Sequence, residues 1–115
     1  MMQPVKRQDA EYVAEVMKVL GDKNRLHILS LLKKQELCVC EITALCHLSQ
    51  SNVSQHLAKL RTAGLVKERR SAQWIYYSIN ESSFPLLADI LKVLPEQDDE
   101  ISMIRELKDH SECKT

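Results

Sequence analysis

The chain has 115 residues, of which 44% are hydrophobic and 28% are charged, and its net charge is zero. This length predicts a single domain over residues 1–115, with flexible ends at 1–9 and 110–115. No apolar run approaches the roughly 20 residues that cross a bilayer, and residues 1–7 lack the apolar centre of a signal peptide. We therefore expect a cytoplasmic protein without membrane contact, in which cysteines bind metal, react or pack more often than they form structural disulfides.

Helical spacing of apolar residues predicts the first half of the fold. One helix is expected over residues 9–20 and a second over 23–34, with Gly21 ending the first and Asp22 capping the second. After an extended connection at 35–39, two helices at 40–46 and 50–63 are separated by a tight break at 48–50. This pair is typical of a helix-turn-helix.

Two β-rich runs at residues 65–70 and 73–79 flank a short polar turn and predict a hairpin. A further helix is expected before Pro95, and a final short helix over 100–108. The fold class is therefore mainly α with a β-hairpin wing: a winged helix-turn-helix of order α-α-α-α-β-β-α(-α). The terminal helices are more apolar than a small monomer needs, which predicts a homodimer through them.

The helix at 50–63 has one apolar face, formed by Val53, Leu57 and Leu60, and a hydrogen-bonding face opposite. A helix of this kind suits a DNA groove. Residues 59–70 hold five basic residues and one acid, whereas residues 96–112 hold seven acids and two basic residues. The neutral total thus hides a basic segment that is expected to face phosphate.

Cys38 and Cys40 lie one residue apart, directly before the predicted helix-turn-helix. Paired thiolates select soft ions such as As(III), Sb(III), Cd(II), Pb(II), Zn(II) or Cu(I). A complete site needs a third sulfur for trigonal As(III) or four ligands for zinc. Cys113 is the first candidate for the missing ligand and Cys46 the second, although Cys46 also suits the core. The sequence contains no Cys-x-x-Cys motif, no Gly-rich phosphate loop and no catalytic triad, so an enzyme is not expected.

Four segments together resemble the ArsR/SmtB family of metal-responsive repressors, of the arsenical-resistance type. They are LGDKNRLHIL at 20–29, ELCVCE at 36–41, SQSNVSQHLAKL at 49–60 and GLV at 64–66. The resemblance implies a homodimer that binds double-stranded operator DNA when metal-free and leaves it when a metal or metalloid ion binds. Thr43 stands where arsenite-responsive members often carry a third cysteine, and residues 81–95 offer no His for a zinc site.

The resemblance and the helix pattern together assign the DNA contacts. Base edges and nearby phosphates are expected to meet Ser51, Asn52, Ser54, Gln55 and His56. Further phosphate contacts are expected from Ser49, Gln50, Lys59 and Arg61, and wing contacts from Arg69, Arg70, Ser71 and Gln73.

The predicted function is a repressor released by a soft ion at Cys38 and Cys40, with As(III) or Sb(III) first and Cd(II), Pb(II) or Zn(II) as alternatives. A thiol redox or persulfide sensor of the same fold stays open, in which Cys38 or Cys40 pairs with Cys113. A winged helix used only for protein contacts is a third possibility, and it predicts no salt-dependent DNA affinity.

Overall fold

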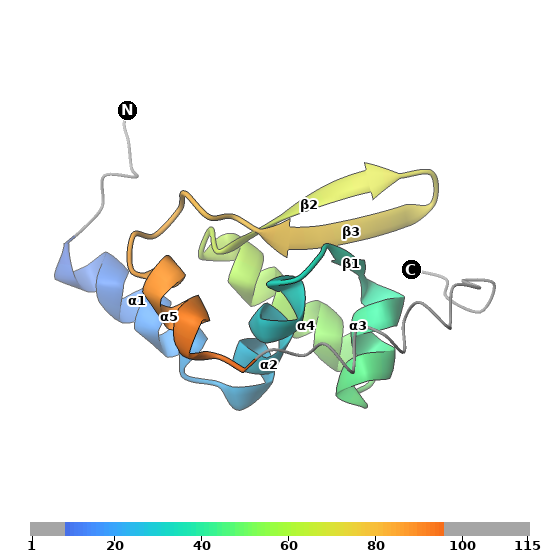
Figure 1. Ribbon diagram of the computed structural model, residues 1–115, viewed down its shortest axis with the longest axis horizontal. Helices are drawn as coiled ribbons and strands as arrows, with labels where there is room; N and C mark the ends of the chain where they lie inside the picture. Colours follow the sequence, from blue (N-terminus) through green and yellow to red (C-terminus); the bar gives the residue numbers. More distant parts are fainter. Residues whose placement is uncertain (1–8, 96–115) are drawn as a thin grey trace.

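The computed structural model describes residues 9–95. In chain order the elements are α1 (Ala10–Leu20), α2 (Lys23–Leu32), β1 (Leu37–Cys38), α3 (Val39–Cys46), α4 (Gln50–Thr62), β2 (Val66–Ser71), β3 (Trp74–Ile79) and α5 (Leu87–Val93). The helices form one body, and the β2–β3 hairpin projects from it as a wing (Figure 1). The predicted winged helix-turn-helix is confirmed, while the helix expected at 100–108 and both chain ends lie outside the described residues.

Local signals set the helix ends where the sequence predicts them. Asp9 caps α1, and the Asp22 carboxylate accepts the backbone N–H groups of Asn24 at 2.8 Å and Arg25 at 3.2 Å to cap α2. Gly64 ends the α4 region with φ +83°, a left-handed conformation that glycine adopts without steric cost. These groups satisfy backbone donors and acceptors that each helix end leaves open.

The core lies between the helices and the base of the wing. It contains fully buried side chains from α2, α3 and α4, such as Ile28, Ile42 and Leu57. Leu65 and Leu87 add buried side chains from the segment before β2 and from α5. Each buried Leu or Ile contributes about 1.5–3 kcal/mol through removal from water. This packing fixes α3 and α4 against each other and holds the wing beside them.

The sheet has three strands rather than the two of the predicted hairpin. Its order is β1-β3-β2, and all pairs are antiparallel. The third strand, β1, comes from the segment that the sequence predicts as an extended connection, and its Cys38 pairs with Tyr76 of β3. The cysteine segment is therefore part of the wing sheet as well as the start of α3.

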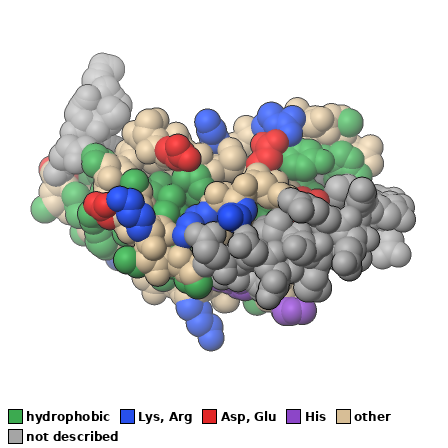
Figure 2. Space-filling model, viewed as in Figure 1, with side chains coloured by type: hydrophobic (Ala, Val, Ile, Leu, Met, Phe, Trp, Pro, Cys, Tyr) green, Lys and Arg blue, Asp and Glu red, His purple; other side chains and the backbone are tan. Residues whose placement is uncertain are grey.

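Apolar side chains remain exposed on the terminal helices. Met17 of α1 is 40% exposed, Leu86 before α5 is 43% exposed and Val93 of α5 is 79% exposed. Hydrophobic side chains gather on the visible face at the end of the molecule that carries α1 and α5 (Figure 2). Within residues 9–95, every helix is too short or too polar to cross a membrane.

Candidate DNA-binding and thiol site

Cys38 has two structural roles, because it is the last residue of β1 and the N-cap of α3. Its side chain is fully buried, and its N–H donates to Glu41 Oε1 at 2.9 Å. Burial raises the pKa of the Cys38 thiol, and the neighbouring Glu41 carboxylate raises it further, although the backbone N–H groups of Glu41 and Cys40 act in the opposite direction. An ion that binds Cys38 must therefore displace a proton.

The other cysteines differ in placement and state. Cys40 lies in the first turn of α3, is half-buried, and its sulfur is disulfide-bonded. Cys38 and Cys46 are not disulfide-bonded. Cys113 lies outside the described residues. Binding of a soft ion by the Cys38–Cys40 pair thus requires Cys40 in its reduced form.

Cys46 ends α3, six residues beyond Cys40, and a helix rises about 9 Å over that span. Thiolates sharing one ion with bonds of about 2.3 Å lie within about 5 Å of each other. We therefore expect Cys46 to lie outside any ion site that contains Cys40 while α3 is intact. Thr43 also lies on α3, and its buried Oγ1 has no hydrogen-bond partner in the described part of the chain. No group of three or more potential metal ligands occurs among residues 9–95.

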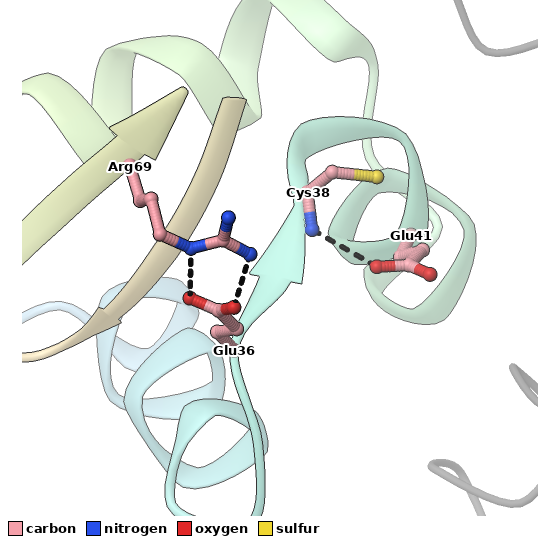
Figure 3. A network of polar contacts seen from close by, with 4 residues as sticks. All are labelled: Glu36, Cys38, Glu41 and Arg69. Carbon is pink, nitrogen blue, oxygen red and sulfur yellow. Dashed lines mark hydrogen bonds and ion pairs between the residues drawn. The ribbon is translucent and has the colours of Figure 1, made fainter. Parts of the chain in front are cut away.

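An ion pair joins the residue before β1 to the wing. The guanidinium of Arg69 on β2 donates from Nε and Nη2 to the two carboxylate oxygens of Glu36 (Figure 3). The same guanidinium lies 5.0 Å from the ring centroid of Tyr76, the residue that pairs with Cys38. Two links therefore connect the cysteine segment to the wing: the strand pairing and the ion pair.

The polar face of α4 is open for contact. Val53, Leu57 and Leu60 are fully buried. The side chains predicted to meet base edges are exposed, apart from the half-buried His56, and the set is Ser51, Asn52, Ser54, Gln55 and His56; Gln50, a predicted phosphate contact, is exposed as well. Ser49 has a capping role, since its Oγ accepts the N–H of Asn52 at 3.1 Å. The alternation of buried and exposed positions presents a hydrogen-bonding surface to solvent, as the sequence predicts.

Two of the predicted DNA-binding cations already have acidic partners. Arg61 lies 3.9 Å from Glu68 of β2, and Arg69 is held by Glu36. Lys59, Arg70, Ser71 and Gln73 are exposed. The sequence did not identify Glu36, Glu41 or Tyr76 as part of this site. Glu41 has a recognisable signal, because an acid three residues after a cap forms a capping box, whereas Glu36 and Tyr76 join the site only through strand pairing.

Comparisons with known proteins identify the family. The profile described as "Bacterial regulatory protein, arsR family" matches residues 22–68. Nodulation protein NolR of Rhizobium meliloti is 42% identical over 91 residues, which is 79% of this chain and 70% of NolR. The chain belongs to the ArsR family. This family consists of DNA-binding transcriptional regulators and not of enzymes.

Another relative and a solved structure extend the ArsR-family likeness. Arsenic resistance transcriptional regulator ArsR1 of Pseudomonas putida is 46% identical over 66 residues, which is 56% of this chain and about half, 52%, of the relative. The crystal structure of NolR from Sinorhizobium fredii superposes with a TM-score of 0.66 at 37% identity, covering 84% of this chain and 98% of that one. The winged-helix scaffold of this ArsR-family chain is thus shared with NolR over nearly all of the NolR structure.

Proposed function

We propose that this ArsR-family chain is a homodimeric cytoplasmic repressor that a soft thiophilic ion, bound at Cys38 and Cys40, releases from operator DNA. As(III) and Sb(III) are the first candidates, and Cd(II), Pb(II) and Zn(II) are the alternatives. One observation carries the proposal: Cys38 is both the N-cap of α3 and a residue of the strand paired with the wing. A ligand at this residue acts on two DNA-facing elements at once.

The first route for coupling is the N-terminus of α3. Cys38 and Glu41 form a capping box, in which the sulfur accepts the Glu41 N–H and the Glu41 carboxylate accepts the Cys38 N–H. An ion bound to the sulfur competes with that backbone N–H, so the cap weakens. Because Ile42 and Leu45 of α3 are buried in the same core as Leu57 of α4, a shift of α3 moves the DNA-reading helix.

The second route is the wing. A movement of β1 is transmitted to β3 through the Cys38–Tyr76 pairing and to β2 through the Glu36–Arg69 ion pair. Arg69 is also one of the proposed phosphate contacts, so its position decides how the wing meets DNA. Coupling of this kind typically amounts to about 1–3 kcal/mol, which is 5- to 150-fold in affinity.

The described residues supply two sulfur ligands, and this pair suits a soft ion. Cys113, a residue of the other subunit or solvent would complete the coordination. The hydroxyl of Thr43, three residues after Cys40, is a hard oxygen donor and a poor third ligand for these ions. Replacing it by a thiol would place a third sulfur on the same helix as Cys40.

The DNA surface in this proposal consists of the exposed face of α4 and the wing. Ser51, Asn52, Ser54, Gln55 and His56 meet base edges and nearby phosphates. Contacts with the DNA phosphate backbone come from Gln50 and from the side chains of Lys59, Arg61, Arg69, Arg70, Ser71 and Gln73. Ser49 contributes by capping α4 and so keeps its N-terminus in place for phosphate.

The test is a fluorescence-anisotropy titration of the reduced protein on its own upstream DNA, with each of the five ions added in turn. We expect release by at least one ion, and no release from the double variant Cys38→Ser, Cys40→Ser, which should still bind DNA. Cys46→Ser is the matched control and should respond like the wild type. Thr43→Cys should lower the As(III) concentration needed. Unchanged release from the double variant would overturn the assignment of the site.

A redox-sensing repressor is the second candidate function, because the sulfur of Cys40 is disulfide-bonded whereas those of Cys38 and Cys46 are not. In this function hydrogen peroxide takes two electrons from the Cys40 thiol and a second cysteine thiol, which join in a disulfide while the peroxide is reduced to water, and DNA affinity changes as a result. The same anisotropy titration, with peroxide added in place of an ion, distinguishes the redox-sensing function from the ion-sensing function. Release by peroxide, reversed by dithiothreitol and abolished by Cys40→Ser, with no response to any ion, would establish the redox function.

A further inference from the structure

Arg25, near the start of α2, joins three elements through one residue. Its Nε donates to the carbonyl oxygen of Val19 in the last turn of α1 at 2.6 Å. Its Nη1 lies 3.1 Å from Nδ1 of His56 on α4. Its backbone N–H donates to Asp22, the cap of α2. The side chain therefore fixes the position of the His56 ring relative to the rest of the helical body.

The geometry of the pair favours one tautomer of a neutral His56 ring. A guanidinium has five N–H donors and no acceptor, and it keeps its charge at any pH that a folded protein tolerates. The contact with Arg25 is a hydrogen bond only if His56 Nδ1 accepts through its lone pair. A neutral imidazole then carries its proton on Nε2, which lies on the side of the ring away from Nδ1. The half-buried ring thus keeps one donor for an outside partner.

We propose that Arg25 is a positioning residue for DNA recognition, which holds His56 as the neutral Nε2–H tautomer so that His56 donates to an acceptor on a base edge of the operator. The acceptors of this kind in the major groove are purine N7, guanine O6 and thymine O4. The inference rests on the proposed function, in which α4 reads DNA. It assigns to Arg25, a residue outside the predicted DNA surface, control over what α4 recognises.

The tautomer is measured on the free, reduced protein, without DNA or inducer. Long-range ¹H–¹⁵N spectra separate an unprotonated Nδ1 from an unprotonated Nε2, and His56→Asn identifies the His56 signals among the four histidines. At pH 7.5 we expect the Nε2–H form in the wild type and a mixture of tautomers in Arg25→Gln. Lys18→Gln is the matched control, since Lys18 and Arg25 both line one surface hollow and Lys18 is paired with Glu15. A protonated or Nδ1–H His56 in the wild type overturns the proposal.

The DNA-binding experiment uses two substitutions of His56, each of which keeps the function of one ring nitrogen and removes that of the other. Asparagine places its oxygen near the position of Nδ1 and keeps the contact with Arg25 but has no donor at the Nε2 position. Glutamine places its amide N–H near Nε2 and loses the Nδ1 acceptor. We expect His56→Asn to lower the ratio of operator to scrambled-DNA affinity about five- to tenfold, the loss of one hydrogen bond, and Arg25→Gln to lower it by a similar factor.

A double-mutant cycle decides whether Arg25 acts through His56. In the His56→Asn background, Arg25→Gln should change the discrimination ratio less than twofold. If the two substitutions lower the discrimination ratio independently, so that their factors multiply, the positioning role is overturned. If the substitutions weaken binding to operator and scrambled DNA equally, the base-edge contact is overturned in favour of a phosphate contact. This test can be told apart from the test of the proposed function. Even if no ion releases the protein from DNA, the His56 tautomer and the discrimination ratio can still be measured. If Arg25→Gln fails to fold, the wild-type tautomer and the discrimination ratio of His56→Asn still test the proposal.

Discussion

Asp22 shows how a single side chain links folding to pH. Burial acts to raise the pKa of its carboxyl, but the backbone N–H groups of Arg25 and Asn24 donate to it and bring the pKa below its ordinary value of 3.8. A lowered pKa in the folded state means that the carboxylate stabilises the fold above pH 3.8. This contribution is lost as the pH falls through the folded-state pKa.

We therefore predict that Asp22→Ala lowers the free energy of unfolding by about 1 kcal/mol at pH 7, as for other N-cap replacements. The deficit should shrink towards zero as the pH falls below the folded-state pKa. Urea unfolding at a series of pH values and a fixed protein concentration measures it. Asp22→Asn is the control, because asparagine also caps a helix but does not titrate. A deficit that stays constant across the acid range would contradict the prediction.

At this scale the sequence is most informative where a residue acts on its own neighbours. Asp22 and Gly64 are predictable because a cap and a left-handed glycine depend only on the adjacent backbone. The contacts of Arg69 with Glu36 and of Arg25 with His56 span 33 and 31 positions. Such pairs depend on strand register and helix packing, for which one sequence carries no local signal.

Among the elements, β1 changes the interpretation of the cysteine pair. The sequence predicts α1 to α4 within a few residues, because each has an apolar stripe and a stop signal. The two residues of β1 are too few for an alternating pattern, and the strand exists because β3 offers it a partner. The sequence alone therefore connects Cys38 to the helix-turn-helix but not to the wing.

The link between β1 and the wing leads to a prediction about Glu36. Glu36→Gln removes the acid that holds Arg69, so the guanidinium becomes available to phosphate and one negative charge leaves the wing surface. Operator affinity should rise about two- to fivefold at low salt, the scale of an exposed ion pair, and the gain should fall as salt rises. Release by the inducing ion should weaken, because β1 no longer moves Arg69. Anisotropy titrations with and without the ion give both quantities.

Glu68→Gln is the control for Glu36→Gln. It removes the same charge and frees Arg61 from an exposed but looser ion pair of 3.9 Å, and Glu68 lies on β2, the strand that is not paired with β1. We expect a similar gain in DNA affinity and an unchanged ratio between ion-free and ion-bound affinities. Equal loss of the ion response in both variants would show that wing charge, and not the link through β1, sets the response.

For the whole molecule, the exposed apolar side chains of the terminal helices argue for the dimer. In the proposed dimer each protomer supplies one helix that reads DNA, and half-sites lie about 34 Å apart, so a monomer would meet only one of them. In sedimentation velocity we expect the wild type to be a dimer and Met17→Glu, which places a charge on this surface, to be a monomer with at least tenfold weaker operator binding. Met17→Leu, which keeps the surface apolar, should remain dimeric. Met17 is 40% exposed in the single chain, so a dimer interface over α1 would bury the new charge of Met17→Glu. An unpaired charge buried between subunits is strongly unfavourable. If Met17→Glu remains a dimer, the interface therefore lies elsewhere.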